Sequence, residues 1–264
     1  MRDTKQLSSV LAAQMLASYP EALESQKVDY VLVDEAQDLP PVRLKILRSL
    51  AKRGFVLAAD EGQNLNQSRS PFVRAGLDFL GKSKVLHTNF RNTAPIEALA
   101  RRFYDGPMPA GAFRQGPLPE WTFSDHQQEL LQQMVAKIHL LTDKLGYELE
   151  NILVIHSGDK SGLVDAFMTA KLPFQDVKSR DFQFEKQGFL RLSTFPSAKG
   201  LDSPVVLIFW NKVFGYPGWS DEAVLRQHRN YGYVAISRAL EHVHLFVRND
   251  DDPFTQELRA ASEV

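Results

Sequence analysis

The feature that most constrains the fold is the alternation of short apolar runs, many of them β-branched, with longer segments of helical periodicity. The runs that we expect to be strands are 30–33, 55–59, 84–86, 152–155, 190–194, 205–210 and 244–247. The segments that we expect to be helices are 7–17, 42–52, 71–80, 95–103, 127–145 and 221–239, and 106–119 is expected to be a loop. Strands that alternate with helical crossovers are typical of parallel sheets covered by helices, so the sequence predicts an α/β protein.

Composition supports ordered cores and narrows the classes of partner. With 264 residues and 44% hydrophobic content, the chain can bury one large core or two modest ones. Acidic and basic residues nearly cancel, 32 against 31, so any DNA-binding groove must be local. The absence of cysteine excludes disulfides and cysteine zinc sites. Residues 1–9 are polar and no apolar run reaches membrane-spanning length, so we expect a soluble cytoplasmic protein with no membrane partner.

Two adjacent acids follow the first predicted strand. The apolar run that ends at Val33 leads directly into Asp34 and Glu35. Ligands bind at the carboxyl ends of strands in open parallel sheets. Hydrolysis of a nucleotide needs one carboxylate that holds hydrated Mg²⁺ and a second group that activates the attacking water, and these two acids suit those roles. The alternative is that Asp34 or Asp38 only caps the helix that begins near Pro41.

Polar side chains also follow the next two predicted strands. The strand 55–59 leads into a segment that contains Gln63, which is suited to sensing a terminal phosphate. The strand 84–86 is followed by Phe90 and Arg91. A guanidinium fork suits phosphate oxygens, and the ring of Phe90 is suited to stacking on a base. Taken alone, Arg91 would be expected to form a surface ion pair and Phe90 to lie in the core. Only their position in the chain favours a role in nucleotide binding.

Two more clusters lie nearer the C-terminus. Residues 193–202 follow a predicted strand and are rich in small hydroxylated side chains. Such hydroxyls, together with backbone amides, can hold a phosphate of DNA or of a nucleotide. Residues 231–239 place Arg238 on an otherwise apolar helix. Arg238 is then either an arginine at a helix edge with a buried stem or an arginine finger that reaches ATP.

Taken together and in this order, the clusters resemble motifs II to VI of the UvrD/Rep-type superfamily 1 DNA helicases, across nearly the whole chain. The resemblance implies that Asp34 binds Mg²⁺ and that Glu35 is the catalytic base for ATP hydrolysis. It implies that Gln63 links the γ-phosphate to the DNA site. Phe90 resembles the aromatic residue that stacks on adenine, and Arg91 one of the two arginines on the γ-phosphate.

The resemblance also assigns roles in the C-terminal clusters. Arg238 corresponds to the second arginine on the γ-phosphate, and Asp202 to the acid that contacts the nucleotide sugar. Thr194, Ser197 and Lys199 fall where the family contacts the DNA backbone or couples it to ATP. The fold implied is two RecA-like domains with ATP in the cleft between them. Residues 1–86 would then be a partial first domain, and 87–264 a complete second domain without the large accessory insertion.

The sequence departs from the family at several positions. An aromatic pair that stacks on bases usually follows the motif III glutamine, whereas Asn66 and Ser68 stand here. Motif V has Pro196 where histidine is usual, and motif III begins with Ala59 instead of glycine. Because stacking contributes roughly 1–3 kcal/mol per base, we expect a weaker grip on single strands or weaker coupling.

The phosphate-binding loop of the family precedes motif II by far more residues than precede Asp34 here. We therefore expect an N-terminal P-loop segment or a partner subunit to supply it, and the chain alone to lack ATPase activity. The segment 76–83 matches the P-loop pattern G-x-x-x-x-G-K-[ST]. However, Leu77, Phe79 and Leu80 resemble the apolar face of a helix that ends at Gly81, whereas a P-loop follows a strand and opens a helix.

The sequence supports one main function and leaves two others open. The main hypothesis is that the chain is part of an ATP-dependent translocase acting on single-stranded or partly duplex DNA. The alternative is a degenerate, helicase-like module that binds DNA or a protein without catalysis. A metal-dependent nuclease that uses Asp34 and Glu35 is the least supported, because no further cluster of carboxylates and lysine accompanies them.

Overall fold

The computed structural model describes residues 10–14, 17–59, 71–79, 81–84, 89–104, 114–158, 160–211, 218 and 220–263. The chain divides into two compact units, Met1–Val85 and Leu86–Val264. The assignment of 1–86 and 87–264 to a partial and a complete RecA-like domain stays a prediction. Within the described ranges, no helix has both the length and the apolar character needed to cross a membrane.

The first unit contains a parallel β–α–β crossover. Strand β1 (Val28–Val33) is followed by a short 3-10 helix η1 (Ala36–Asp38), helix α3 (Pro41–Leu50) and strand β2 (Ala51–Leu57). β1 and β2 pair in parallel. Helix α2 (Pro20–Gln26) precedes β1, and helix α4 (Pro71–Arg74) follows β2. The core of this unit joins one face of the sheet to α3 and contains Val33, Ala36, Leu44 and Ala75.

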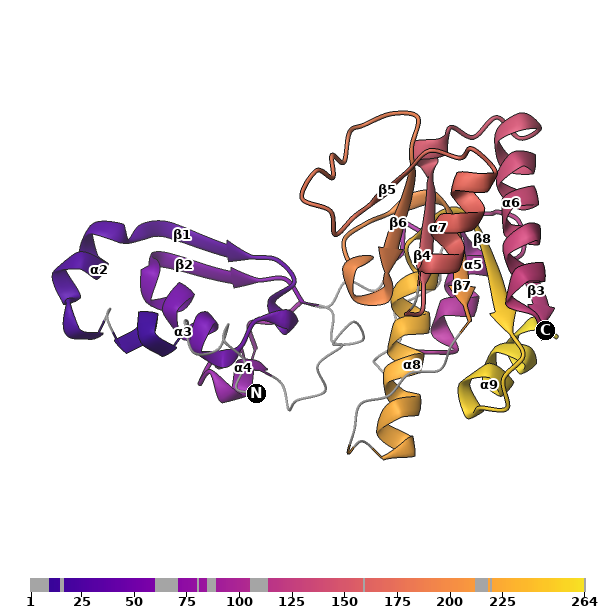
Figure 1. Ribbon diagram of the computed structural model, residues 1–264. Helices are drawn as coiled ribbons and strands as arrows, with labels where there is room; N and C mark the ends of the chain where they lie inside the picture. Colours follow the sequence, from indigo (N-terminus) through magenta and orange to yellow (C-terminus); the bar gives the residue numbers. More distant parts are fainter. Residues whose placement is uncertain are drawn as a thin grey trace. The chain divides into compact units, whose positions relative to one another are not determined.

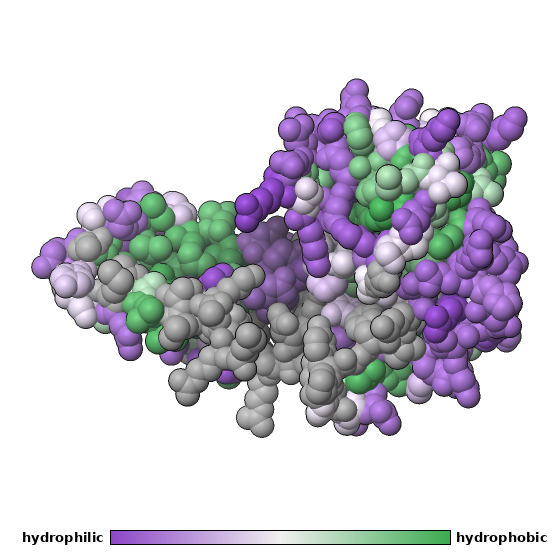
Figure 2. Space-filling model, in the orientation of Figure 1, coloured by the Kyte–Doolittle hydropathy of each residue, from purple (hydrophilic) through white to green (hydrophobic). Residues whose placement is uncertain are grey.

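The opposite face of the two-stranded sheet is apolar and lies at the surface. Leu32 and its register partner Val56 are 76% and 56% exposed. Tyr30 lies on the same face, over Gly54, where an added Cβ would be only 2.7 Å from Tyr30 Cδ1. Figure 2 shows the hydrophobic surface over these strands. Parallel sheets are usually covered on both faces, so this face is unusual for a parallel sheet.

The second unit is built on a six-stranded sheet with the order β3-β8-β7-β4-β6-β5, in which every neighbouring pair is parallel. The strands are β3 (Glu120–Ser124), β4 (Ile152–His156), β5 (Phe174–Asp176), β6 (Leu190–Thr194), β7 (Ser203–Trp210) and β8 (Ala239–Arg248). The predicted α/β class, with parallel sheets and flanking helices, is confirmed.

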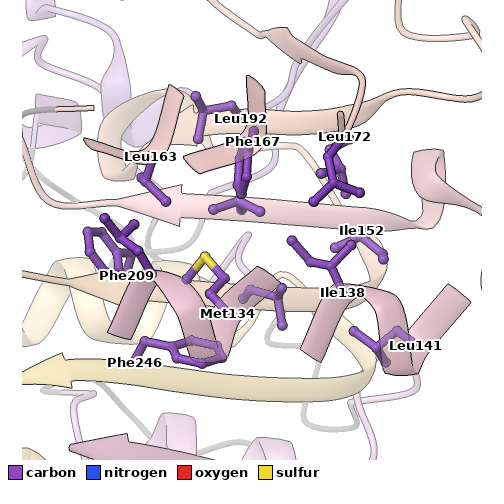
Figure 3. Close-up of a cluster of buried hydrophobic side chains, with 14 of the residues drawn as sticks. Met134, Ile138, Leu141, Ile152, Leu163, Phe167, Leu172, Leu192, Phe209 and Phe246 are labelled. Atoms are coloured by element: carbon purple, nitrogen blue, oxygen red, sulfur yellow. The ribbon is translucent and has the colours of Figure 1, made fainter. Parts of the chain in front are cut away.

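Helices cover both faces of this sheet (Figure 1). α6 (Gln127–Asp143) packs beside α7 (Ser161–Thr169) on one face, and α5 (Ala94–Arg101), α8 (Asp221–Ile236) and α9 (Pro253–Ser262) pack together on the other. Figure 3 shows the core under α6 and α7, where Met134 and Phe167 meet Phe209 of β7. On the other face, Trp210 contacts Phe254 of α9 at 4.8 Å between ring centroids. Burial on both faces explains why β4 and β7 are continuous apolar runs.

The order of the strands creates a switch point at the centre of the sheet. The connection after β4 leads towards β5, whereas the connection after β7 leads in the opposite direction, to β8. β4 and β7 are neighbours. In open α/β sheets, ligands bind outside the carboxyl ends of the strands at such a point. The residues that follow β4 and β7 are therefore candidates for a binding site.

Several predicted elements are wrong in extent. Of the predicted helix 71–80, the described residues 71–79 are helical only over Pro71–Arg74. The predicted helix 221–239 ends at Ile236, and β8 begins at Ala239. Lys84, the described residue of the predicted strand 84–86, is not in a strand. Elements that were not predicted are α2, β3, α7, β5 and α9. In the expected loop 106–119, the described residues 114–119 contain only an isolated bridge between Arg114 and Thr93.

Candidate functional site

Asp34 and Glu35 lie directly after β1, at the carboxyl end of the two-stranded sheet. Glu35 has a left-handed φ of 50°, and its backbone N–H donates to Asp34 Oδ1 at 2.8 Å. Gln37, only 4% exposed, donates from Nε2 to Glu35 Oε2 at 2.5 Å. Two backbone hydrogen bonds with Ala58 tie this turn to the end of β2. The turn is thus held on both sides, and the strained φ of Glu35 is of the kind found at functional sites.

The capping role considered for the acids is wrong. The residue that precedes the first turn of α3 is Pro40, and no side-chain hydrogen bond caps this helix. Asp38 is the last residue of η1. Asp34 is exposed and Glu35 is half-buried. Their placement is therefore not explained by helix capping.

The side chains at this turn suit a magnesium site that waters and phosphates complete, and not a metal site formed by protein ligands alone. Mg²⁺ is usually held by one or two carboxylates together with waters and substrate phosphates, which is what Asp34 and its neighbour Glu35 can offer. Within the described ranges, no group of three or more His, Cys, Asp or Glu side chains is placed to hold a metal ion. The role of Asp34 in magnesium binding stays a prediction. Gln63, with Asn66 and Ser68, lies outside the described residues.

The segment that matches the P-loop pattern does not have P-loop geometry. α4 ends at Arg74, and Gly76 and Gly81 have φ values of 69° and 70°. Within 71–79 and 81–84 no strand precedes Gly76 and no helix begins at Lys82. A P-loop requires both elements. The apolar side chain of Leu77 instead packs against the core of the first unit.

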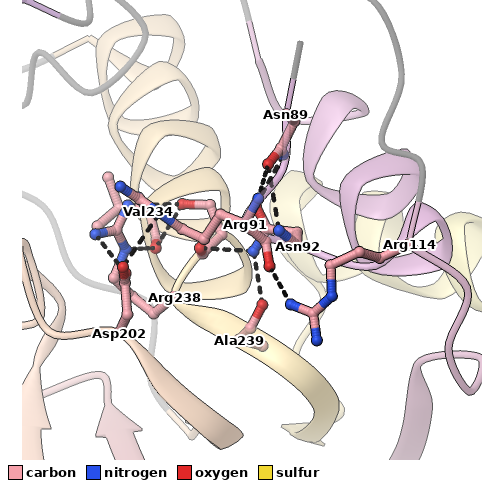
Figure 4. A network of polar contacts seen from close by, with 9 residues as sticks. Asn89, Arg91, Asn92, Arg114, Asp202, Val234, Arg238 and Ala239 are labelled. Carbon is pink, nitrogen blue, oxygen red and sulfur yellow. Dashed lines mark hydrogen bonds and ion pairs between the residues drawn. The ribbon is translucent and has the colours of Figure 1, made fainter.

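In the second unit, Arg91, Asp202 and Arg238 converge from three separate segments (Figure 4). Arg91 Nε lies 3.1 Å from Asp202 Oδ2, and Arg238 Nη1 lies 3.2 Å from Asp202 Oδ1. Asp202 immediately precedes β7, and Arg238 immediately precedes β8. Because the strands are parallel, the cluster lies at the amino edge of the sheet.

Arg238 is 2% exposed, and α8 ends before it, at Ile236. Arg238 lies in the turn before β8. The prediction that it lies on a helix is therefore wrong, and so is the alternative of an arginine at the edge of that helix. Its Nε donates to Val234 O at 3.1 Å and its Nη2 to Ser237 Oγ at 3.2 Å. These two acceptors are neutral, whereas Asp202 places a negative charge beside the buried guanidinium.

Phe90 and Arg91 lie in the segment before α5, which Asn92 anchors. Asn92 is 3% exposed, and its Nδ2 donates to Ser237 O at 2.9 Å and to Ala239 O at 2.6 Å. Arg114 Nη1 donates to Arg91 O at 2.7 Å. Phe90 is 73% exposed, so the core alternative for this ring is wrong. Sequence reasoning missed Asn92, for which the only sequence signal was its place beside Arg91.

Thr194, Ser197 and Lys199 belong to a segment that starts at the other edge of the sheet, where β6 ends. Thr194 ends β6, and its Oγ1 donates to Ser197 Oγ at 3.2 Å across the 3-10 helix η4 (Phe195–Ser197). Phe195 is buried against Trp210, with ring centroids 5.4 Å apart. Lys199 is half-buried in the following turn. Thr194 and Ser197 therefore lie at the carboxyl edge, and Asp202 lies at the amino edge.

Two polar residues that sequence reasoning missed mark the switch point at the carboxyl edge. Ser157 follows β4, and its Oγ donates to Asn211 Oδ1 at 3.1 Å. Asn211 follows β7, and its backbone N–H donates to Ser157 Oγ at 3.1 Å. Burial lowers the pKa of the preceding His156 to about 4, so its ring is neutral near pH 7. The available signal was the run of His156, Ser157 and Gly158 after an apolar strand.

No protein-family model matches the sequence, and no curated protein matches it. Among solved structures, the chain is similar to the C-terminal domain of a possible DNA helicase from Lactobacillus plantarum WCFS1, with 15% identity and a TM-score of 0.48. The match covers 63% of this chain and 92% of that chain. A likeness of this extent assigns no activity, so function rests on the residues of the site.

Proposed function

We propose that this chain is the part of a UvrD/Rep-like, ATP-dependent DNA translocase that carries motifs II to VI. One observation carries the proposal. Arg91, Asp202 and Arg238 come from three segments that the motif pattern assigns to one nucleotide, and both arginines lie within ion-pair distance of Asp202. Their sequence separations give no local reason for them to meet. A shared role at a phosphate explains why two arginines occupy one corner of the fold.

The first unit is proposed to supply the carboxylates. Asp34 would hold Mg²⁺, which neutralises charge on the phosphates when bound. Glu35 would accept a proton from the attacking water, and the hydrogen bond from Gln37 fixes one of its oxygens. Gln63 would sense the γ-phosphate.

The second unit is proposed to supply the groups that bind the nucleotide. Phe90 presents an exposed ring suited to stacking on adenine. Arg91, which is 49% exposed, can reach a phosphate by rotation of its side chain. Arg238 is buried and would act on the γ-phosphate only after a local rearrangement. An arginine that stabilises the transferred charge is worth roughly a thousandfold or more in rate.

The opposite edge of the same sheet is proposed to contact DNA. Thr194, Ser197 and Lys199 would bind the backbone of single-stranded or partly duplex DNA, as hydroxyls and lysines commonly do. Ser157 and Asn211 lie at the switch point of that edge, where both are buried and hydrogen-bonded to each other. The P-loop is proposed to come from an N-terminal segment or a partner subunit.

The test compares DNA-stimulated ATP hydrolysis by this chain alone with hydrolysis by the chain joined to a first-domain segment that carries a P-loop. We expect little turnover by the chain alone, because Asp34 and Glu35 cannot act on phosphates that nothing cradles. The joined protein should hydrolyse ATP, and Glu35→Gln or Arg91→Ala should lower turnover far more than DNA binding, which rests on many contacts. Normal hydrolysis by both variants would reject the assignment.

A second candidate is a binding module without catalysis, and one observation favours it. Both arginines are already paired with Asp202, as in a purely structural network. This candidate predicts that the joined protein binds single-stranded DNA but hydrolyses no ATP. It also predicts that Arg91→Ala changes stability alone.

A further inference from the structure

We propose that Asp202 is a positioning residue, whose carboxylate orders Arg91 and Arg238 before the phosphate binds instead of contacting the nucleotide sugar. This inference rests on the proposed function. The two oxygens of the carboxylate face different guanidinium groups, Oδ2 at 3.1 Å from Arg91 Nε and Oδ1 at 3.2 Å from Arg238 Nη1. The same carboxylate therefore sets the position of both arginines.

A carboxylate between the two arginines solves an electrostatic problem. Two guanidinium groups repel each other, and an acid between them offsets that repulsion. The need is greatest at Arg238, whose side chain is 2% exposed, whereas the side chain of Asp202 is 32% exposed. Removing the acid would take a negative charge away from a guanidinium that is almost fully buried, which is costly.

The backbone next to Asp202 is anchored to the backbone of Arg238. The next residue, Ser203, begins β7, and its backbone N–H donates to Arg238 O at 3.0 Å. The backbone of Asp202 and that of Arg238 are thus joined at the starts of two neighbouring strands. Arg91 is the more accessible of the two arginines, because its side chain is 49% exposed and that of Arg238 is 2% exposed. Its long side chain loses less entropy on meeting a phosphate if the acid has already ordered it.

The first experiment observes the arginines directly in the full chain, without nucleotide. The Nε–Hε signals in a ¹⁵N-correlated NMR spectrum are assigned, and Asp202→Asn is compared with Glu257→Gln. Glu257 is the carboxylate partner of Arg229, with Nε to Oε2 at 2.9 Å, so Glu257→Gln serves as a control at a separate arginine–carboxylate pair. We expect Asp202→Asn to shift the signals of Arg91 and Arg238 and to leave that of Arg229 in place. Unshifted Arg91 and Arg238 signals would overturn the inference.

The second experiment separates a positioning role from a sugar contact. In the chain joined to a P-loop segment, kcat and KM are measured with ATP and with 3′-deoxy-ATP. We expect Asp202→Asn to lower kcat about tenfold or more with both nucleotides, and to add little in an Arg91→Ala background, since residues that act as a unit are not additive. A sugar contact instead predicts a loss that appears with ATP and largely vanishes with 3′-deoxy-ATP, and that outcome would overturn the proposal.

Asp202→Glu covers the case in which Asp202→Asn does not fold. It keeps the charge with a longer reach, so we expect folding together with a kcat between those of the wild type and of Arg91→Ala. A kcat equal to that of the wild type, with displaced Arg91 and Arg238 signals, would show that their position is unimportant. If the wild-type joined protein hydrolyses no ATP, the proposed function fails, while the NMR comparison still decides whether Asp202 places the arginines.

Discussion

Replacing Asn92 with alanine should destabilise the second unit by about 2–4 kcal/mol. The side chain is 3% exposed and makes three hydrogen bonds. Its Nδ2 donates to Ser237 O and Ala239 O at 2.9 and 2.6 Å, and its Oδ1 accepts from Asn89 Nδ2 at 2.9 Å. Each bond is worth about 0.5–1.5 kcal/mol net, and a buried carbonyl that loses its donor costs more.

Urea unfolding followed by tryptophan fluorescence measures this loss. The tryptophans of the chain, at 121, 210 and 219, all belong to the second unit, so the signal reports on that unit. The control is Gln133→Ala, which removes the amide of an exposed residue that donates to Glu129 Oε1 at 3.2 Å. We expect the control to change the unfolding free energy by less than about 0.5 kcal/mol. An equally small loss for Asn92→Ala, with an unchanged m-value, would refute the reasoning.

Two further predictions concern protonation and the segment that matches the P-loop pattern. Burial lowers the pKa of His156 and of His244 to about 4, below the usual 6.5, so the folded chain binds fewer protons than the unfolded chain between these values. The unfolding free energy should therefore fall as the pH decreases from 6.5 to 4, by at most about 1.4 kcal/mol per pH unit for each histidine. Urea unfolding measures this fall, which should be smaller for His156→Gln. A midpoint of unfolding that does not change with pH would contradict the prediction. Lys82→Ala should leave the affinity of the chain for ATP unchanged in calorimetry, and a clear loss would restore the P-loop hypothesis.

The central strands were predicted from sequence because they are buried on both faces. β4, β6 and β7 each correspond to a predicted apolar run, and their side chains are almost all buried. β3 and β5 lie at the two edges of the sheet and were missed. Glu120–Ser124 mixes polar and aromatic residues, and Phe174–Asp176 is too short to give a pattern. Edge strands need less apolar surface, so periodicity is a weak signal for them.

Some residues of the candidate site could be proposed from the sequence, and others could not. The clusters around Asp34, Arg91 and Arg238 were proposed from sequence because their order along the chain resembles the helicase motifs, and their roles stay predictions. Asn92 was missed because its partners are backbone carbonyls 145 and 147 positions away, which no local pattern reveals. Ser157 and Asn211 were missed for a related reason, since their contact depends on β4 lying beside β7.

The segment from Thr194 to Asp202 gives a physical basis for linking the two proposed sites of the second unit. Every neighbouring pair in the sheet is parallel, so the chain must return from the carboxyl end of β6 to the amino end of β7. Phe195 and Ala198, which are 1% and 0% exposed, anchor this return in the core. Because packed side chains resist local deformation, a displacement of Ser197 by DNA would move this short segment as a unit. Its far end is Asp202, the residue that holds both arginines.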